Sequence, residues 1–429
     1  MISKIQVYLL FALFGVAAAN NLKAVPEGPL PDAVFDRDIR TVRLFKEGWE
    51  FGYPILEMGD DKPLLLQFDV LNNNYKNYSY SVVHCDADWM PSRMSYTEYM
   101  EGFYQNSLAD YKNSFSTYVA YQHYELKLPN ENVRLKLSGN YVVLVYESGN
   151  EDKPLLIKRF TVIDSKVEIK GRVRRPTLTR FQDAYQEVDF TILHPEYPID
   201  NPHQTLKVVV IKNNQWKLSI NDLKPLFIRD KEIVYDLEEK NLFPGGNEYR
   251  SFDTKNVKHQ LPNLAYFGYR HNRYEVDLVQ DKSRANSPYF TIDDLNGKYS
   301  VENQQGLSPA TDADYVNVHF SLRSLDEVPN GNVYVYGAFN DFNTYDDCKM
   351  TYNAETQNYE LDYLVKQGYC NYQYVFKPNS TDDIDETLFE GSYYETENDY
   401  VIYVYYRPFG SRYDSLLGYK VLNSKIMNN

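Results

Sequence analysis

Short runs of hydrophobic and polar residues, divided by Gly, Asn, Asp and Pro, follow one another along most of this 429-residue chain. Residues 78–85 (YSYSVVHC) alternate with period two, as a half-buried strand does. Residues 63–70, 117–128, 140–147 and 155–163 also form strand-like runs. Short strands between turn residues are typical of β-sandwiches, so we expect an all-β protein.

Two polar stretches divide these runs into three regions. The first region ends near residues 164–166, and residues 303–314 (NQQGLSPATDAD) have the small, polar composition of a linker. The sequence thus predicts three immunoglobulin/E-set-like β-sandwich domains in tandem, at residues 20–165, 166–302 and 303–429. Residues 92–114 break the strand pattern, which leaves a short helix or a long irregular excursion open there.

The N-terminal residues have the pattern of a secretory signal peptide. Lys4 gives a positive start, residues 7–16 are apolar, and Ala17, Ala18 and Ala19 provide small residues at a cleavage site. The apolar run is short for a membrane span. We therefore predict a signal peptide at residues 1–19, cleaved after Ala19, and an exported mature protein.

Composition narrows the class of partner. The chain has 41 Tyr and 22 Phe, residues that favour strands, and a formal net charge of -15. Without a basic excess, nucleic acid and anionic membrane surfaces are unfavourable partners. The three cysteines allow two interpretations, which are a Cys348–Cys370 disulfide with Cys85 left over, or three buried free thiols.

The stretch HCDADW places His84, Asp86 and Asp88 on one strand face, where they are a weak candidate for a metal site. Neighbours on one face are about 6.6 Å apart, whereas zinc ligands converge to about 2 Å from the ion. We therefore favour a buried His84 followed by a polar turn. The chain has no HExxH or GxSxG motif, and acidic pairs such as Asp346–Asp347 lie in expected loops. We predict no catalytic residues and no cofactor, with an Asp- or Glu-based hydrolase as the weakest alternative.

The third region has a strand and turn at residues 335–342, followed by a strand at 372–376. This order resembles the small β-sandwich of glycogen- and starch-binding modules, which stack sugars on exposed Trp. The region has no Trp, and Phe342 or Tyr345 would have to serve instead. The resemblance implies the fold of the third region and leaves a periplasmic glycan-binding protein as the alternative function.

Four stretches together resemble one family. They are HCDADW at 84–89, LSGNYVVLVY at 137–146, LFPGGNEYRSFD at 242–253 and NDYVIYVYYRPFGSRYDSLLGY at 398–419. The chain is similar to the plug protein of the type IX secretion system of Bacteroidetes. The resemblance implies a periplasmic, non-enzymatic protein of β-sandwiches that closes the periplasmic opening of the giant outer-membrane translocon barrel. Its membrane association would come only through that barrel.

The last of these stretches has two halves. Residues 400–406 are apolar on both faces, which predicts a strand buried between two layers. Pro408 and Gly410 then end the alternation. The aromatic and arginine residues around this point are the type that anchors protein interfaces. These candidate partner-binding residues are Tyr406, Arg407, Phe409, Arg412, Tyr413 and Tyr419. The alternative is that they fold back onto the third region.

Overall fold

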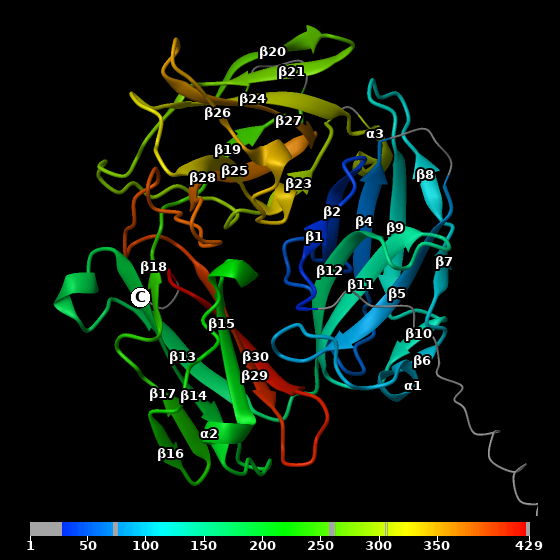
Figure 1. The fold of residues 1–429 in the computed structure, drawn as a ribbon, viewed down its shortest axis with the longest axis vertical. Coiled ribbons are helices and arrows are strands. Elements are labelled where there is room, and N and C mark those ends of the chain that lie inside the picture. Colours follow the sequence, from blue (N-terminus) through cyan, green and yellow to red (C-terminus); the bar gives the residue numbers. More distant parts are fainter. Residues whose placement is uncertain are drawn as a thin grey trace, which may run out of the picture.

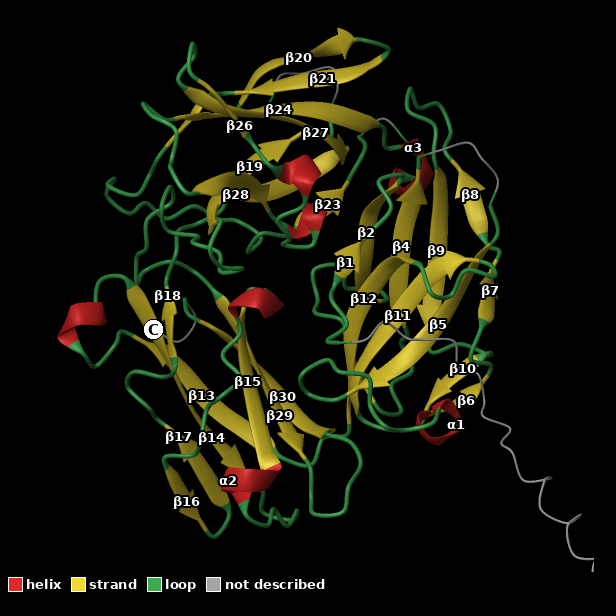
Figure 2. Ribbon diagram, viewed as in Figure 1, coloured by secondary structure: helices red, strands yellow, loops and turns green. Residues whose placement is uncertain are grey.

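The computed structural model describes residues 28–71, 76–256, 261, 263–304, 306 and 308–425; the predicted signal peptide lies outside them. The all-β prediction is confirmed, because nearly every element is a strand (Figure 2). The sheets pack face to face in three sandwiches that meet around a common junction (Figure 1). Among the described residues, none of the helices has the length and apolar character needed to cross a bilayer.

The first sandwich, at the right of Figure 1, uses residues 33–163. Its elements are β1 (Ala33–Val34), β2 (Ile39–Lys46), β3 (Ile55–Glu57), β4 (Leu64–Val70), β5 (Tyr78–Cys85), α1 (Tyr96–Tyr99), β6 (Met100–Gly102), β7 (Asn106–Leu108), β8 (Tyr111–Asn113), β9 (Gln122–Leu128), β10 (Val133–Leu135), β11 (Gly139–Glu147) and β12 (Pro154–Ile163). One sheet has the order β1-β12-β11-β5-β7, with β3 also paired to β12, and the other has the order β2-β4-β9-β8. Phe68, Tyr80, Tyr141 and Phe160 fill the core between them.

The second sandwich, at the lower left, combines two distant parts of the chain. Its elements are β13 (Glu168–Arg174), η1 (Thr179–Phe181), β14 (Tyr185–Leu193), α2 (Pro202–Thr205), β15 (Leu206–Lys212), η2 (Trp216–Leu218), β16 (Phe227–Arg229), β17 (Glu232–Tyr235), β18 (Leu242–Pro244), β29 (Asp399–Tyr406) and β30 (Ser415–Asn423). A sheet of order β13-β14-β17-β16, with β18 on β14, faces the sheet β15-β29-β30.

The third sandwich lies at the top. Its elements are β19 (Arg250–Asp253), β20 (Leu264–Arg270), β21 (Arg273–Leu278), β22 (Asp281–Lys282), β23 (Tyr299–Val301), α3 (Pro309–Asp312), β24 (Tyr315–Arg323), β25 (Gly331–Tyr336), η3 (Ala338–Asn340), η4 (Asp346–Cys348), β26 (Thr351–Asn353), β27 (Asn358–Lys366) and β28 (Gly368–Pro378). The sheet β20-β21-β24-β27-β26, with β22 on β24, packs on β19-β28-β23, with β25 on β28.

The sheets do not follow the predicted domain boundary between residues 302 and 303. Strand β29 pairs with β15, and Ile402 lies opposite Val210 across that ladder. Conversely, β19, β20 and β21 precede the boundary but belong to the third sandwich. The chain therefore leaves the second sandwich, builds the third, and returns. Alternation shows which face of a strand is buried but not which strand it pairs with, so this prediction was wrong.

Three local expectations also change. The excursion at 92–114 contains α1 and three short strands, β6 to β8. The strand expected from residue 117 begins only at Gln122. The expected linker holds α3 and ends in Asp314, whose carboxylate accepts hydrogen bonds from the backbone N–H groups of Tyr118 and Val119 at 2.6 and 3.0 Å. This segment joins the first and third sandwiches instead of spacing two domains apart.

Strand β29 is buried on both faces, as predicted for residues 400–406. Tyr400 and Ile402 point into the core of the second sandwich. Tyr403 and Tyr405 pack on the opposite side, in a cluster with Ile163 of the first sandwich. The sheet β15-β29-β30 therefore serves both as half of one core and as the contact surface for another sandwich.

Candidate functional site at the junction of the sandwiches

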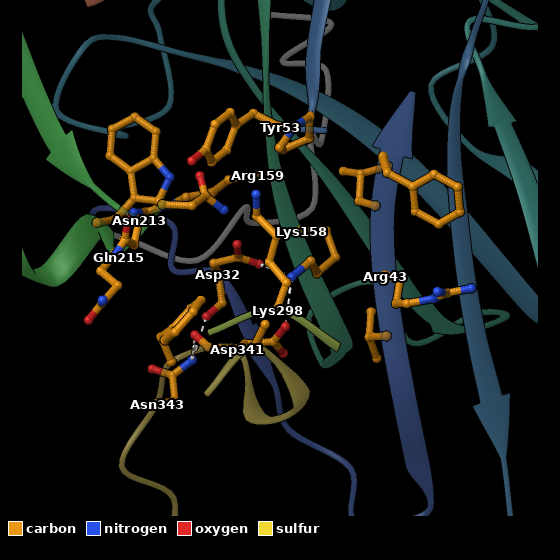
Figure 3. Close-up of a pocket in the computed structure, with 18 of the residues that line it drawn as sticks. Asp32, Arg43, Tyr53, Lys158, Arg159, Asn213, Gln215, Lys298, Asp341 and Asn343 are labelled. Carbon is orange, nitrogen blue, oxygen red and sulfur yellow. Dashed lines mark hydrogen bonds and ion pairs between the residues drawn. The ribbon is translucent and has the colours of Figure 1, made fainter. Parts of the chain in front are cut away.

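A cavity of about 200 Å³ lies where the three sandwiches meet. The first sandwich and the segment before it contribute Asp32 and Lys158, the second contributes Gln215, and the third contributes Lys298 and Asp341 (Figure 3). All three sandwiches thus supply polar side chains to this one cavity. This junction is the candidate functional site.

Lys158 lies between two carboxylates from different parts of the chain. It forms ion pairs of 2.8 Å with Asp32, which precedes β1, and with Asp341, which follows β25 (Figure 3). Burial raises the pKa of Asp341 to about 6, although the Lys158 ammonium opposes this shift. Asn343 adds a hydrogen bond of 2.8 Å from its amide nitrogen to the carbonyl of Asp32. These contacts fix the third sandwich to the sheet that contains β12.

Arg159 joins the first and second sandwiches through aromatic rings. Its guanidinium lies 4.4 Å from the ring centroid of Trp89 and 5.6 Å from that of Trp216. The two indoles meet edge to face with centroids 4.7 Å apart. Arg159 Nε donates to the carbonyl of Leu30 at 2.8 Å, and burial lowers the pKa of Arg159 to about 10. The cation is therefore held by π-systems and a carbonyl.

Lys298 faces the cavity from the third sandwich. Its ammonium lies 4.7 Å from the ring centroid of Tyr53, and its ion pair with Asp399 is 4.0 Å long. The Tyr53 hydroxyl donates to the same carboxylate at 2.9 Å. Burial lowers the pKa of Lys298, and the negative charge of Asp399 offsets this shift only in part.

A separate buried network centred on Asp69 links the first and third sandwiches. Its carboxylate lies 2.6 Å from Lys366 Nζ, 2.7 Å from the Tyr315 hydroxyl and 2.6 Å from His123 Nδ1. The side chains of Asp69 and Lys366 are 0% and 2% exposed. Lys366 also lies 4.1 Å from the ring centroid of Tyr121. Separating the two charges of a buried pair costs free energy, so this pair couples the two sandwiches.

The stretch LFPGGNEYRSFD runs along the junction between the second and third sandwiches. A Cβ at Gly245 would lie 2.0 Å from the carbonyl oxygen of Tyr393, so only glycine fits this close approach. A few residues later, Arg250 pairs with Asp281 at 2.7 Å and with Glu390 at 3.0 Å. This Gly-rich turn therefore serves packing between two sandwiches.

The predicted candidate metal ligands do not converge. His84 is buried, with Nδ1 2.8 Å from the Ser92 hydroxyl and Nε2 3.3 Å from the Ser138 carbonyl. Asp86 is half-buried and Asp88 is exposed. Burial lowers the pKa of His84 to about 4. The structure thus agrees with a buried histidine that starts a polar turn.

Within the described residues, three carboxylates do come together at Glu187, Asp189 and Asp236. Arg174 contacts all of them, with ion pairs of 2.7 Å to Glu187 and 3.3 Å to Asp236 and a further close pair to Asp189. The guanidinium already supplies the positive charge that a metal ion would bring.

The candidate partner-binding residues lie in different environments. Tyr406 is buried in the core of the second sandwich, and Tyr419 is half-buried against the cluster that joins it to the first. Arg407 forms ion pairs of 2.6 Å with Asp86 and 2.8 Å with Asp414. These residues are part of the internal structure.

The rest of the loop between β29 and β30 rests on the first sandwich. Arg412 forms an ion pair with Glu98, and the ring of Tyr413 meets the edge of His84 with centroids 5.4 Å apart. Phe409 is different, because its side chain is 77% exposed. The loop thus docks on the first sandwich, where the alternative had placed it on the third region, and it presents Phe409 to solvent.

Other predicted residues are also buried. Cys85, Cys348 and Cys370 are free thiols in the structure, so the Cys348–Cys370 bridge is not formed. Phe342 is 8% exposed, and the Tyr345 hydroxyl accepts a hydrogen bond of 2.8 Å from the backbone N–H of Val34. Phe342 therefore offers little ring surface for stacking a sugar, and Tyr345 is half-buried.

The sequence did not reveal the junction cavity. Lys158 and Lys298 are single lysines in ordinary contexts, and Lys158 is 183 positions from its partner Asp341. No local spacing connects such residues. The strand and turn predicted at residues 335–342 contribute Tyr336, Asp341 and Phe342 to the cavity wall, and Trp89 of the HCDADW stretch contacts Arg159.

These features define an all-β protein of fused sandwiches with its polar networks at the junctions. The family model described as "Type 9 secretion system plug protein 1st domain" matches residues 39–164. The crystal structure of a hypothetical protein from Parabacteroides merdae is 34% identical, with a TM-score of 0.89, over 92% of this chain and 100% of that one. A native alpha-2-macroglobulin fragment from Escherichia coli is 10% identical with a TM-score of 0.14 and bears on neither fold nor function. No curated protein matches the chain.

The match at residues 39–164 places the chain in the type IX secretion system plug domain family. Membership makes it a component of the type IX secretion system, with a place in the cell envelope. That family is a structural secretion component and not a known family of enzymes.

Proposed function

We propose that this protein binds the periplasmic side of the outer-membrane translocon barrel of the type IX system and closes its pore without catalysing a reaction. It would reach the periplasm through its signal peptide and associate with the membrane only through the barrel. The family supports this role, since its name describes a plug.

The fusion of the sandwiches into one body is the observation that carries the proposal. A plug has to keep its shape against a wide opening, which independent domains on flexible linkers would not do. Here the Asp69–Lys366 pair, the Lys158–Asp341 pair and strand β29 join neighbouring sandwiches through buried contacts. Such contacts favour a single rigid unit.

The loop between β29 and β30 suits a reversible contact with the barrel. Its base is anchored by Arg407 and Asp414, and Gly410 has a φ of 87° in the turn that follows Phe409. An aromatic side chain held out by a fixed loop is the type of anchor that transient interfaces use. Of the six predicted contact residues, Phe409 and Arg412 are exposed enough to serve directly.

Co-purification tests the proposal. Tagged protein, crosslinked in outer-membrane extracts, is expected to bring down a very large barrel protein, and repeated absence of that protein would refute the role. Phe409→Asp should weaken capture about 30-fold, because the loss of an interface anchor that contributes about 2 kcal/mol changes the affinity by that factor. Leu325→Asp is the matched control, because Leu325 is also exposed, at 68%, but lies in the third sandwich. Equal capture of both variants would place the contact elsewhere on the protein.

A further inference from the structure

The junction cavity has a local charge opposite to that of the whole chain. Its walls carry five cations, Arg43, Lys158, Arg159, Lys217 and Lys298, against three anions, Asp32, Glu50 and Asp341. The protein as a whole has a formal charge of -15. A positive pocket in an acidic protein attracts anions selectively.

Lys217 is exposed, and two of the other four cations are poorly compensated by the protein. Lys158 and Arg43 have close carboxylates, at 2.8 Å to Asp341 and 3.0 Å to Glu50. Lys298 has only the 4.0 Å pair with Asp399, and Arg159 has no ion pair with a carboxylate among the described residues. A buried cation without a close counterion is costly, so an incoming anion would be stabilised there.

The same walls hold two buried polar atoms with no hydrogen-bond partner in the described structure. They are the hydroxyl of Tyr336 and Oε1 of Gln215, in residues that are 0% and 1% exposed. Nearly all buried polar atoms are paired in folded proteins, and exceptions call for an explanation. The Tyr336 hydroxyl can donate to a carboxylate, and Gln215 Oε1 can accept from a hydroxyl or an N–H.

The remaining wall is aromatic. Tyr53, Trp216, Tyr299 and Phe342 line the cavity beside these polar groups. Apolar walls with a few fixed polar groups are typical of sites for small molecules. From these observations we infer that the cavity binds a small carboxylate with an aromatic body and one further hydrogen-bond donor. Because the site touches all three sandwiches, such a ligand stabilises their arrangement.

Calorimetric titration of the full-length mature protein tests this inference with three probes of one shape. They are 4-hydroxyphenylacetate, its neutral alcohol analogue 4-hydroxyphenethyl alcohol, and its cationic analogue tyramine. The acid should bind with a Kd on the order of 0.1–1 mM, as expected for about eleven heavy atoms in a fitted site. It should also raise the Tm, because it binds only the assembled junction. The alcohol should bind at least tenfold more weakly, and tyramine should not bind.

Variants locate the binding. Lys298→Met should weaken acid binding at least tenfold and remove the preference over the alcohol. Tyr336→Phe removes only an unpaired hydroxyl, so it should keep the wild-type Tm and still weaken the acid several-fold. Lys231→Met, at an exposed lysine in the second sandwich, should change nothing. No saturable binding of the acid, equal binding of the alcohol, or unchanged affinity in Tyr336→Phe would each overturn the inference.

Discussion

Replacing Lys366 with methionine should separate the first sandwich from the third. The substitution keeps most of the side-chain volume but removes the ammonium that lies 2.6 Å from the Asp69 carboxylate. The Asp69 carboxylate, which is 0% exposed, would then keep the Tyr315 hydroxyl and His123 Nδ1 as partners but lose its lysine counterion. Removing one partner of a buried pair costs about 3–5 kcal/mol, because the other charge is left uncompensated.

Urea unfolding followed by circular dichroism and tryptophan fluorescence measures this loss. With an m-value of about 3 kcal/mol/M, the expected shift of the midpoint is about 1–1.7 M toward lower urea. The two probes should give one transition in the wild type and two in the variant, because the sandwiches no longer unfold together. The double variant Asp69→Asn/Lys366→Met should recover about 1–3 kcal/mol, since it removes the uncompensated charge.

Lys112→Met, at an exposed lysine of the first sandwich, is the control. Lys112 is 68% exposed and lies 4.0 Å from Glu125, so its loss should cost less than about 1 kcal/mol. If Lys366→Met behaves like Lys112→Met, and its two probes still report one transition, then the Asp69 network does not hold the sandwiches together.

Three further predictions concern the loop, the pH response and the thiols. Asp414→Asn removes the anion that pairs with Arg407 at 2.8 Å and with Lys207 at 3.0 Å. The free energy of opening of residues 407–414 should fall by about 2 kcal/mol, which hydrogen exchange of their amides would show as faster exchange. Unchanged exchange would contradict the docking of the loop. Burial raises the pKa of the Asp294 carboxyl to about 7. The folded state therefore binds the carboxyl proton more tightly than the unfolded state does. The stabilisation from the protonated carboxyl is lost as pH rises from about 4 to 7. Asp294→Asn should therefore gain on the order of 2–4 kcal/mol relative to wild type between pH 4 and pH 8, while a constant difference across that range would refute the assignment. All three cysteines are buried and free, so a thiol reagent should modify none of them in the native protein. After denaturation without reductant it should modify all three. A single reactive thiol in the denatured protein would instead show that Cys348 and Cys370 form a disulfide.

The positions of the strands are the part of the fold that the local sequence predicts. Strand β5 spans Tyr78–Cys85, the bounds that the alternation at residues 78–85 predicts. The strand is buried on both faces and not half-buried as predicted, because Val83 and Cys85 pack in a second cluster on the side away from the core. Residues 400–406 are apolar on both faces because β29 lies between two packed layers. The bounds of both strands follow from the local sequence, and for β29 so does the burial of both faces.

Pairing and junctions could not be predicted in this way. Val210 and Ile402 are neighbours across a ladder, yet nothing in either strand specifies the other. The same holds for Asp69 and Lys366, which are 297 positions apart. Stretches that carry the family resemblance, HCDADW and the end of NDYVIYVYYRPFGSRYDSLLGY, meet each other through Asp86 and Arg407. Nothing in either stretch predicts this contact, which depends on how the sandwiches pack.

The proposed plugging of the pore is tested most directly by electrical conductance. Purified translocon barrel, stripped of this protein, is placed in a planar bilayer, and the protein is added to the periplasmic side. We expect the open conductance to fall in a saturable way and to return when the protein is washed out, with Phe409→Asp requiring higher concentrations. An open conductance that stays unchanged at saturating protein would contradict the proposed function.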